Sequence, residues 1–410
     1  MHSIYEDEIH DMREIISERS VDFYIKHKVS PVTRDISKLE VYFEKRESLF
    51  RHLGIIPSFL ADKTVLEFGP GGGHNSIYTL GLKPTRYVLV DGNKTGLASV
   101  EHLFQKNLNG VTQYELVESF IEDFSTQEKF DLVICENVIP LQQNDPAHVL
   151  RCVADYVKPG GLLVITCMDP VSFFADVLGH LAGELIVRPE MTTQEKLDAM
   201  RPFFQMKLDA IPGANTIVDD FMMDSIIQHY PENGKMQTIS DTVNELSNTF
   251  DVYGSSPHFL IDWRWYKNIH GDQALFNKRA IDLYDTNIYN LLDYRCELKE
   301  IESRENTLVR KLCNSVFEAT KKFRKDRQLI YIKSIRCNVN QLANIACKYS
   351  QCTADSLNDF IGGIDAYLTN KPWPRLEKFA PFCGRGTQYL SFIRKHTVRR
   401  SEDDTPGHER

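Results

Sequence analysis

The residues with the clearest capacity for chemistry form a glycine-rich loop that follows an acidic side chain. Glu67 stands two positions before the first of three alternating glycines, Gly69, Gly71 and Gly73, and Pro70 lies between the first two. Glycine is needed in such a loop because the backbone must turn tightly and let a ligand lie against its amide groups. The GxGxxG fingerprint of dinucleotide-binding proteins does not fit, because its third glycine would fall on a histidine. The loop therefore predicts a site for a different ligand.

A second acidic residue, Asp91, falls where a ribose-binding group is expected. It ends the apolar run 87–91 and follows the loop by about twenty residues, so its carboxylate can accept hydrogen bonds from both ribose hydroxyl groups. Two further segments follow in order. These are the apolar run 130–136 and the turn into an apolar run over 157–165.

These four segments together resemble the motifs of class I S-adenosylmethionine-dependent methyltransferases. The resemblance is strong over residues 60–168 and extends over 237–268 by topology alone. It implies a Rossmann-like α/β fold built on a seven-stranded methyltransferase sheet. It also implies S-adenosylmethionine as the cofactor, released as S-adenosylhomocysteine. No pyrophosphate is present in that cofactor, so a carboxylate beside the loop is not repelled.

The resemblance also assigns cofactor-binding roles to residues of this chain. The loop from Gly69 to Gly73, with Pro70 and Gly71, would pack against the methionine part of the cofactor. Glu67 would help to orient its ammonium group, and Asp91 would hold its ribose.

Four further residues are assigned by position in the same way. Glu118 and Ser119, after the third predicted strand, match the place that contacts the adenine amino group, although a plain surface loop is an equal interpretation. Glu136 and Asn137, at the end of the fourth strand, would lie near the methyl group, unless they only cap the strand end.

Methyl transfer does not require a general base to be visible in the sequence. The reaction is an in-line displacement at a carbon that the sulfonium charge already activates. Positioning of the nucleophile can supply about 7–11 kcal/mol, whereas a general base adds roughly 10²–10⁴-fold. The candidates for a catalytic base are Glu136 and His258, which precedes the last predicted strand. His148 lies in a predicted helix and is interpreted as an ordinary helix residue.

Three residues are candidates for binding the acceptor. Alternation in the last predicted strand puts Arg264 and Tyr266 on the face opposite Trp263 and Trp265. Arg385 lies between two glycines. If these side chains face the cleft, the two arginines would bind an anionic group of the substrate. The alternative is an edge strand packed under the C-terminal helices, with Arg385 as a turn residue.

The elements that must position these residues follow from the pattern of apolar residues. Short apolar runs that alternate with helical stretches indicate a parallel sheet. The predicted strands cover residues 64–68, 87–91, 112–117, 130–136, 161–168, 250–255 and 259–266.

The same patterns divide the chain into four parts. Residues 1–60 are predicted to form an N-terminal helical cap that includes an amphipathic helix over 36–50. Residues 61–268 form the S-adenosylmethionine-binding domain, with a helical insertion over about 171–235. Residues 269–398 form a helical C-terminal addition, and 399–410 a disordered tail.

Composition narrows the classes of function. The chain has 410 residues, a net charge of −9 and no apolar run long enough to span a membrane. Its N-terminus is acidic and resembles neither a signal peptide nor a transit peptide. The nine cysteines lack the spacing of a metal site, so reduced thiols, a cytoplasmic location and no metal are expected. No nucleic-acid-binding module is recognisable, and no membrane partner is expected. The oligomeric state is left open.

The sequence therefore predicts methyl transfer to an oxygen or nitrogen of a small-molecule acceptor. One alternative is transfer of the aminocarboxypropyl group of the same cofactor, as in nicotianamine-synthase-like proteins. A second alternative is a non-catalytic interaction protein that keeps the fold.

Overall fold

The central element of the protein is a seven-stranded sheet with the strand order β3-β2-β1-β4-β5-β7-β6. The computed structural model describes residues 24, 36–107, 113–141, 145–214, 216–227, 236–297 and 301–396. The strands are β1 (Thr64–Phe68), β2 (Arg86–Asp91), β3 (Tyr114–Glu118), β4 (Phe130–Cys135), β5 (Val157–Cys167), β6 (Phe250–Ser256) and β7 (Gln388–Arg394). Only β7 runs antiparallel to its neighbours, β5 and β6. The predicted Rossmann-like α/β class is confirmed.

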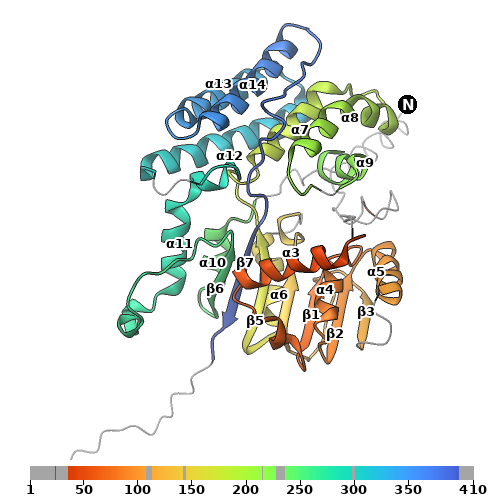
Figure 1. Cartoon of the computed structure of the whole chain (residues 1–410), viewed down its shortest axis with the longest axis vertical. Coiled ribbons are helices and arrows are strands. Elements are labelled where there is room, and N and C mark those ends of the chain that lie inside the picture. The colour runs from red at the N-terminus through yellow and green to blue at the C-terminus, as the bar shows by residue number, and fades with distance from the viewer. Residues whose placement is uncertain are drawn as a thin grey trace, which may run out of the picture.

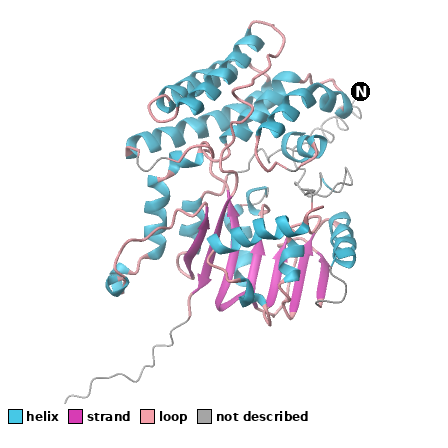
Figure 2. Ribbon diagram, viewed as in Figure 1, coloured by secondary structure: helices cyan, strands magenta, loops and turns pink. Residues whose placement is uncertain are grey.

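Helices cover both faces of the sheet, as the apolar strands require (Figure 2). On one face lie α3 (Leu39–His52), α4 (Ser76–Gly81) and α5 (Lys94–Asn107), whose apolar side chains share one core with the sheet. On the other face lie α6 (Pro146–Asp155) and α10 (Ile239–Leu246), in a second core. The amphipathic helix predicted over 36–50 is confirmed as α3.

A helical bundle lies beyond the carboxyl ends of the parallel strands (Figure 1). It contains α7 (Phe174–Ile186), α8 (Thr193–Ala210), α9 (Val218–Met222), α12 (Ser303–Asp326), α13 (Leu329–Ala346) and α14 (Gln351–Leu368), and α11 (Phe276–Thr286) leads into it from β6. A π-helix covers Met223–Ile227, and short 3₁₀ helices cover Pro57–Leu60, Ile139–Leu141, Tyr266–Asn268, Gly271–Gln273 and Ile288–Leu291. The core beneath α6 and α10 continues into this bundle, so the two parts share buried side chains.

The predicted strand over 259–266 is wrong. These residues form no strand, and Trp263 and Trp265 are 91% and 63% exposed instead of packing under helices. The outer edge of β6 is already occupied, because Asn277 accepts a hydrogen bond from the amide of Val252 and donates one to the carbonyl of Phe250. Alternation indicates only a side chain pattern that suits a half-buried strand, and here no partner strand is available.

The seventh strand comes instead from the far end of the chain. The expectation of helix through to about residue 397 is wrong for Gln388–Arg394, which form β7 between β5 and β6. The helical addition therefore ends before residue 388, and the chain returns to complete the sheet.

Several expectations fall on residues outside the described ranges. They concern most of residues 1–35, the end of the insertion at 228–235 and the tail at 399–410. Within the described ranges, no helix combines the length and the apolar composition needed to cross a membrane.

The position of β7 makes the C-terminal segment essential to the stability of the sheet. Phe392 is completely buried, and its ring lies 6.5 Å from that of Phe250. Phe392→Ala is expected to lower the free energy of unfolding by about 3–5 kcal/mol, because it removes a buried aromatic ring. Urea denaturation followed by circular dichroism measures the loss. The surface control Lys395→Ala should change stability by no more than about 0.5 kcal/mol, and equal losses in both variants would contradict a supporting role for β7.

Candidate active site

The glycine loop joins β1 to α4 and adopts a backbone that only glycine tolerates well. Gly69, Gly71 and Gly73 all have positive φ angles, of 70°, 54° and 79°. A Cβ atom on Gly69 would lie 2.2 Å from Val138, and one on Gly73 would lie 3.1 Å from Val100. The loop is therefore held between α5 and the segment after β4, with no space for side chains at these two positions.

Asp91 lies directly against this loop at the carboxyl end of β2. Its Oδ2 accepts a hydrogen bond of 3.2 Å from the amide of Gly71, and its Oδ1 accepts one of 2.8 Å from the amide of Asn93. Burial raises the pKa of Asp91, and these two amides oppose the shift. The two motifs that the sequence placed twenty residues apart thus meet in one site, with the carboxylate held in a fixed orientation.

Glu67 is buried below the loop, with 4% of its surface exposed. Ser76 donates a hydrogen bond of 2.9 Å to Oε1, and the hydroxyl group of Tyr87 donates one to Oε2. Burial raises the pKa of Glu67 from its ordinary value of 4.5 to about 7, against the effect of these hydrogen bonds. A cationic ligand nearby would stabilise the ionised form of this buried carboxyl group.

An ion pair that the sequence analysis missed crosses the carboxyl end of β4. Arg46 of α3 donates to both oxygens of Glu136, at 2.6 and 3.0 Å, and both side chains are buried. Asn75, just before α4, donates a 2.9 Å hydrogen bond to Glu136, and the hydroxyl group of Tyr42 donates to Asn75 at 2.5 Å. Glu136 was predicted as a catalytic base, but both of its oxygens are occupied in this network. The only signal in the sequence was the position of Arg46, which lies at helical spacing from apolar residues of the predicted amphipathic helix.

The remaining predicted cofactor residues lie at the carboxyl ends of their strands. Asn137 has a φ of 59°, and its amide donates to Thr166 at 2.7 Å. The amide of Ser119 donates to the carbonyl of Asp91 at 3.2 Å. Glu118 and Ser119 both line a cavity of about 430 Å³ beside β3. The structure thus brings Ser119 to the same end of β2 as the glycine loop.

His258 does not share a site with Glu136. Its Nδ1 lies 3.3 Å from the carbonyl oxygen of His52, and the two imidazole rings are 5.5 Å apart. It follows β6, which is three strands away from β4 in the sheet, or about 14 Å at the usual spacing. The two candidate bases therefore do not lie together, and a catalytic role of His258 stays a prediction. His148 lies in α6 beside Cys152, as an ordinary helix residue.

The three predicted acceptor-binding residues do not converge. Arg264 donates to Asp262 and to the carbonyl of Gln273, and Tyr266 is 73% exposed. The guanidinium group of Arg385 donates to main-chain carbonyls at positions 290 and 296. Both arginines thus have structural partners in the described residues, and the alternative interpretation of Arg385 as a turn residue fits better.

Comparison with known proteins agrees with this geometry. Residues 42–191 match a protein-family model described as a methyltransferase domain. The chain is 31% identical over 117 residues to the cypemycin N-terminal methyltransferase of a Streptomyces species, covering 28% of this chain and 45% of that protein. It is 25% identical over 170 residues to the ubiquinone biosynthesis O-methyltransferase of Rickettsia bellii, covering 40% of this chain and 62% of the relative. The chain thus spans about half the length of these curated relatives.

Solved structures with similar folds include PKMT2 from Rickettsia typhi in complex with S-adenosylhomocysteine. That likeness has a TM-score of 0.38 and 17% identity, and it covers 59% of this chain and 50% of the other. The match of residues 42–191, on the fold and loop described above, makes this segment a class I S-adenosylmethionine-dependent methyltransferase domain. The predicted family is confirmed, and S-adenosylmethionine is the cofactor of the domain.

The buried carboxyl group of Glu67 gives the protein a measurable pH dependence. In the folded protein its pKa is about 7, whereas in the unfolded chain it is near 4.5. The folded state therefore loses stability as the pH rises from about 4.5 to 7, because only the unfolded chain ionises freely in that window. Glu67→Gln cannot ionise, so its stability relative to the wild type should rise by about 3 kcal/mol across this range.

Urea denaturation without cofactor, at pH 5 and at pH 8, measures this difference. The exposed Glu47→Gln variant is the control and should follow the wild type at both values. A constant difference between Glu67→Gln and the wild type would contradict the raised pKa.

Proposed function

We propose that this protein transfers the methyl group of S-adenosylmethionine to an oxygen or nitrogen atom of a small-molecule acceptor. The observation that carries the proposal is the hydrogen bond between the amide of Gly71 and the carboxylate of Asp91. It joins the glycine loop to a carboxylate that would accept hydrogen bonds from the ribose hydroxyl groups. The family of residues 42–191 supports the same chemistry.

Different residues of the site would hold different parts of the cofactor. Asp91 would accept hydrogen bonds from the ribose, and the loop around Gly71 would pack against the methionine part. Burial raises the pKa of Glu67, so a nearby cation would stabilise its ionised form. Glu67 would therefore orient the ammonium group. Arg46 is the buried cation of the site, and its Nε has no hydrogen-bond partner among the described residues. It would attract the carboxylate of the cofactor.

The proposal also includes the predicted cofactor contacts of three further residues. Glu118 and Ser119 would contact the adenine amino group from the end of β3. Asn137 would lie near the methyl group, because it follows β4 directly.

Catalysis in this site would depend on alignment more than on proton transfer. The cofactor supplies a methyl group that its sulfonium charge already activates. Glu136 is engaged by Arg46 and Asn75, and His258 contacts the carbonyl of His52 at the end of α3, so the proposal assigns no base to either residue. Positioning contributes about 7–11 kcal/mol by itself. The acceptor would then lose its proton to water.

The proposed acceptor is defined by its accepting atom, which would be nitrogen or oxygen. Of the two relatives described above, one is named as an N-terminal methyltransferase and the other as an O-methyltransferase, which supports nitrogen or oxygen as the accepting atom. The idea of an anionic acceptor rested on Arg264 and Arg385, and it loses that support because both pair within the protein. The bundle lies beyond the carboxyl ends of the strands (Figure 1), and it would shape the acceptor site.

Substitutions at the loop and at Asp91 test the proposal directly. Gly71→Arg should abolish cofactor binding, because the side chain would occupy the space of the ligand and strain a backbone at positive φ. Asp91→Ala should weaken binding by about 1–3 kcal/mol through lost hydrogen bonds to the ribose. Calorimetry with S-adenosylhomocysteine measures both, with the exposed Asp155→Ala as a control that should bind normally. Unchanged affinity for S-adenosylhomocysteine in both site variants would contradict the proposed cofactor site.

The products distinguish the two alternative functions. Methyl transfer yields S-adenosylhomocysteine, whereas aminocarboxypropyl transfer yields methylthioadenosine. A protein that binds cofactor but releases neither product with any of a broad set of amines and phenols would favour a non-catalytic role.

A further inference from the structure

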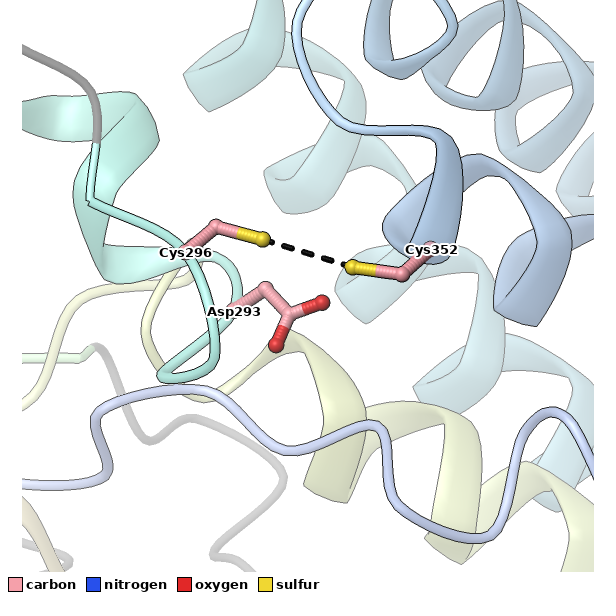
Figure 3. A group of neighbouring side chains, drawn as sticks. All are labelled: Asp293, Cys296 and Cys352. Carbon is pink, nitrogen blue, oxygen red and sulfur yellow. Dashed lines mark hydrogen bonds between the residues drawn. The ribbon is translucent and has the colours of Figure 1, made fainter.

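Two cysteines that lie far apart in the sequence meet at the surface of the helical bundle. The Sγ atoms of Cys296 and Cys352 are 3.4 Å apart, and the residues are separated by 56 positions (Figure 3). Cys296 lies in the turn after the 3₁₀ helix Ile288–Leu291, and Cys352 lies in the first turn of α14. Cys352 is exposed and Cys296 is half-buried, so a small molecule can reach the pair.

The surroundings divide the two thiols into a reactive one and a protected one. Ser350 places its Oγ 3.2 Å from Cys352 and 3.0 Å from Cys296. Burial opposes ionisation of Cys352, but hydrogen bonds from Ser350 and Cys296 and the charge of Arg295 outweigh it and lower its pKa. The N-terminal turn of α14 favours a thiolate in the same way. Burial raises the pKa of Cys296, which therefore keeps its proton.

A metal ion is a weaker explanation of this group. Asp293 completes a possible ligand set with the two cysteines. Its Oδ1 already accepts from the amide and Nε of Arg295, and its Oδ2 accepts from Nη2 of Arg295 and from Thr353. A metal ion would have to displace these donors and lie beside a guanidinium cation. A disulfide between the two cysteines would displace none of these donors to Asp293.

We propose that Cys296 and Cys352 form a reactive dithiol site, which closes to a disulfide by exchange with a small-molecule disulfide such as oxidised glutathione. The thiolate of Cys352 attacks one sulfur of the oxidant and releases one glutathione thiolate, leaving a mixed disulfide on Cys352. Cys296 then gives its proton to water and attacks the Cys352 sulfur, which releases the second glutathione. The protein thiols lose two electrons and one glutathione disulfide gains them.

The disulfide would join α14 to the segment around Cys296, which contacts the part of the chain that leads into β7. Arg385 donates to the carbonyls of Asn290 and Cys296, and the amide of Tyr294 donates to the carbonyl of Cys383. Residues 383–385 lead directly into β7. Oxidation therefore fastens α14 to the segment that holds the entry to β7, and it restricts movement of the bundle relative to the carboxyl ends of the strands.

Peptide mapping of the full chain tests the dithiol. The wild type is incubated with oxidised glutathione, alkylated, digested and analysed by mass spectrometry. The expected product is one linked peptide pair containing Cys296 and Cys352, which dithiothreitol separates, and the melting temperature of the oxidised protein should rise. Cys352→Ser should abolish the linked pair, whereas the matched exposed variant Cys347→Ser should retain it.

A second variant keeps the test decisive if Cys352→Ser folds poorly. Cys296→Ser lacks the second thiol, so it should accumulate glutathione on Cys352 where the wild type does not. The proposal is overturned if the wild type stops at the mixed disulfide or links other cysteines. It is also overturned if the protein carries stoichiometric zinc that Cys352→Ser loses, because the group would then be a metal site.

Discussion

The structure of the site depends on one contact, the hydrogen bond from the amide of Gly71 to the carboxylate of Asp91. It can form because parallel β1 and β2 end at the same edge of the sheet, and because Gly71 carries no side chain that would hold the two apart. The same edge gathers Glu67 below the loop and Glu136 beside it. The proposed cofactor-holding groups at the ends of the strands thus owe their positions to the parallel pairing of neighbouring strands.

The buried ion pair of Arg46 and Glu136 adds the N-terminal helix α3 to this edge. Removal of one partner from such a pair typically costs 3–5 kcal/mol, because the other is left as an uncompensated buried charge. The pair therefore fixes α3 at the end of β4. It also engages both oxygens of Glu136, the residue predicted as a base.

The C-terminal strand connects the two halves of the chain. Because β7 lies between β5 and β6, the helical addition is enclosed within the fold of the sheet and is not a separate module at its end. Arg385 and the segment around Asn290 hold the approach to this strand. Cys296 of the proposed dithiol lies on the same segment, so oxidation would act beside the approach to β7.

The sequence alone determined the features that depend on local backbone chemistry. These include the tight loop at Gly69, Gly71 and Gly73, the carboxylate at the end of the second strand and the approximate positions of the first five strands along the chain, since glycine content and apolar runs are local properties. Tertiary structure decided which segment becomes the seventh strand, because residues 388–394 lie between the edges of β5 and β6 and residues 259–266 pair with neither. It also decided the partners of Arg46, which lies 90 residues from Glu136. Contacts between distant segments form only when the sheet has brought their ends together, and no local pattern records them.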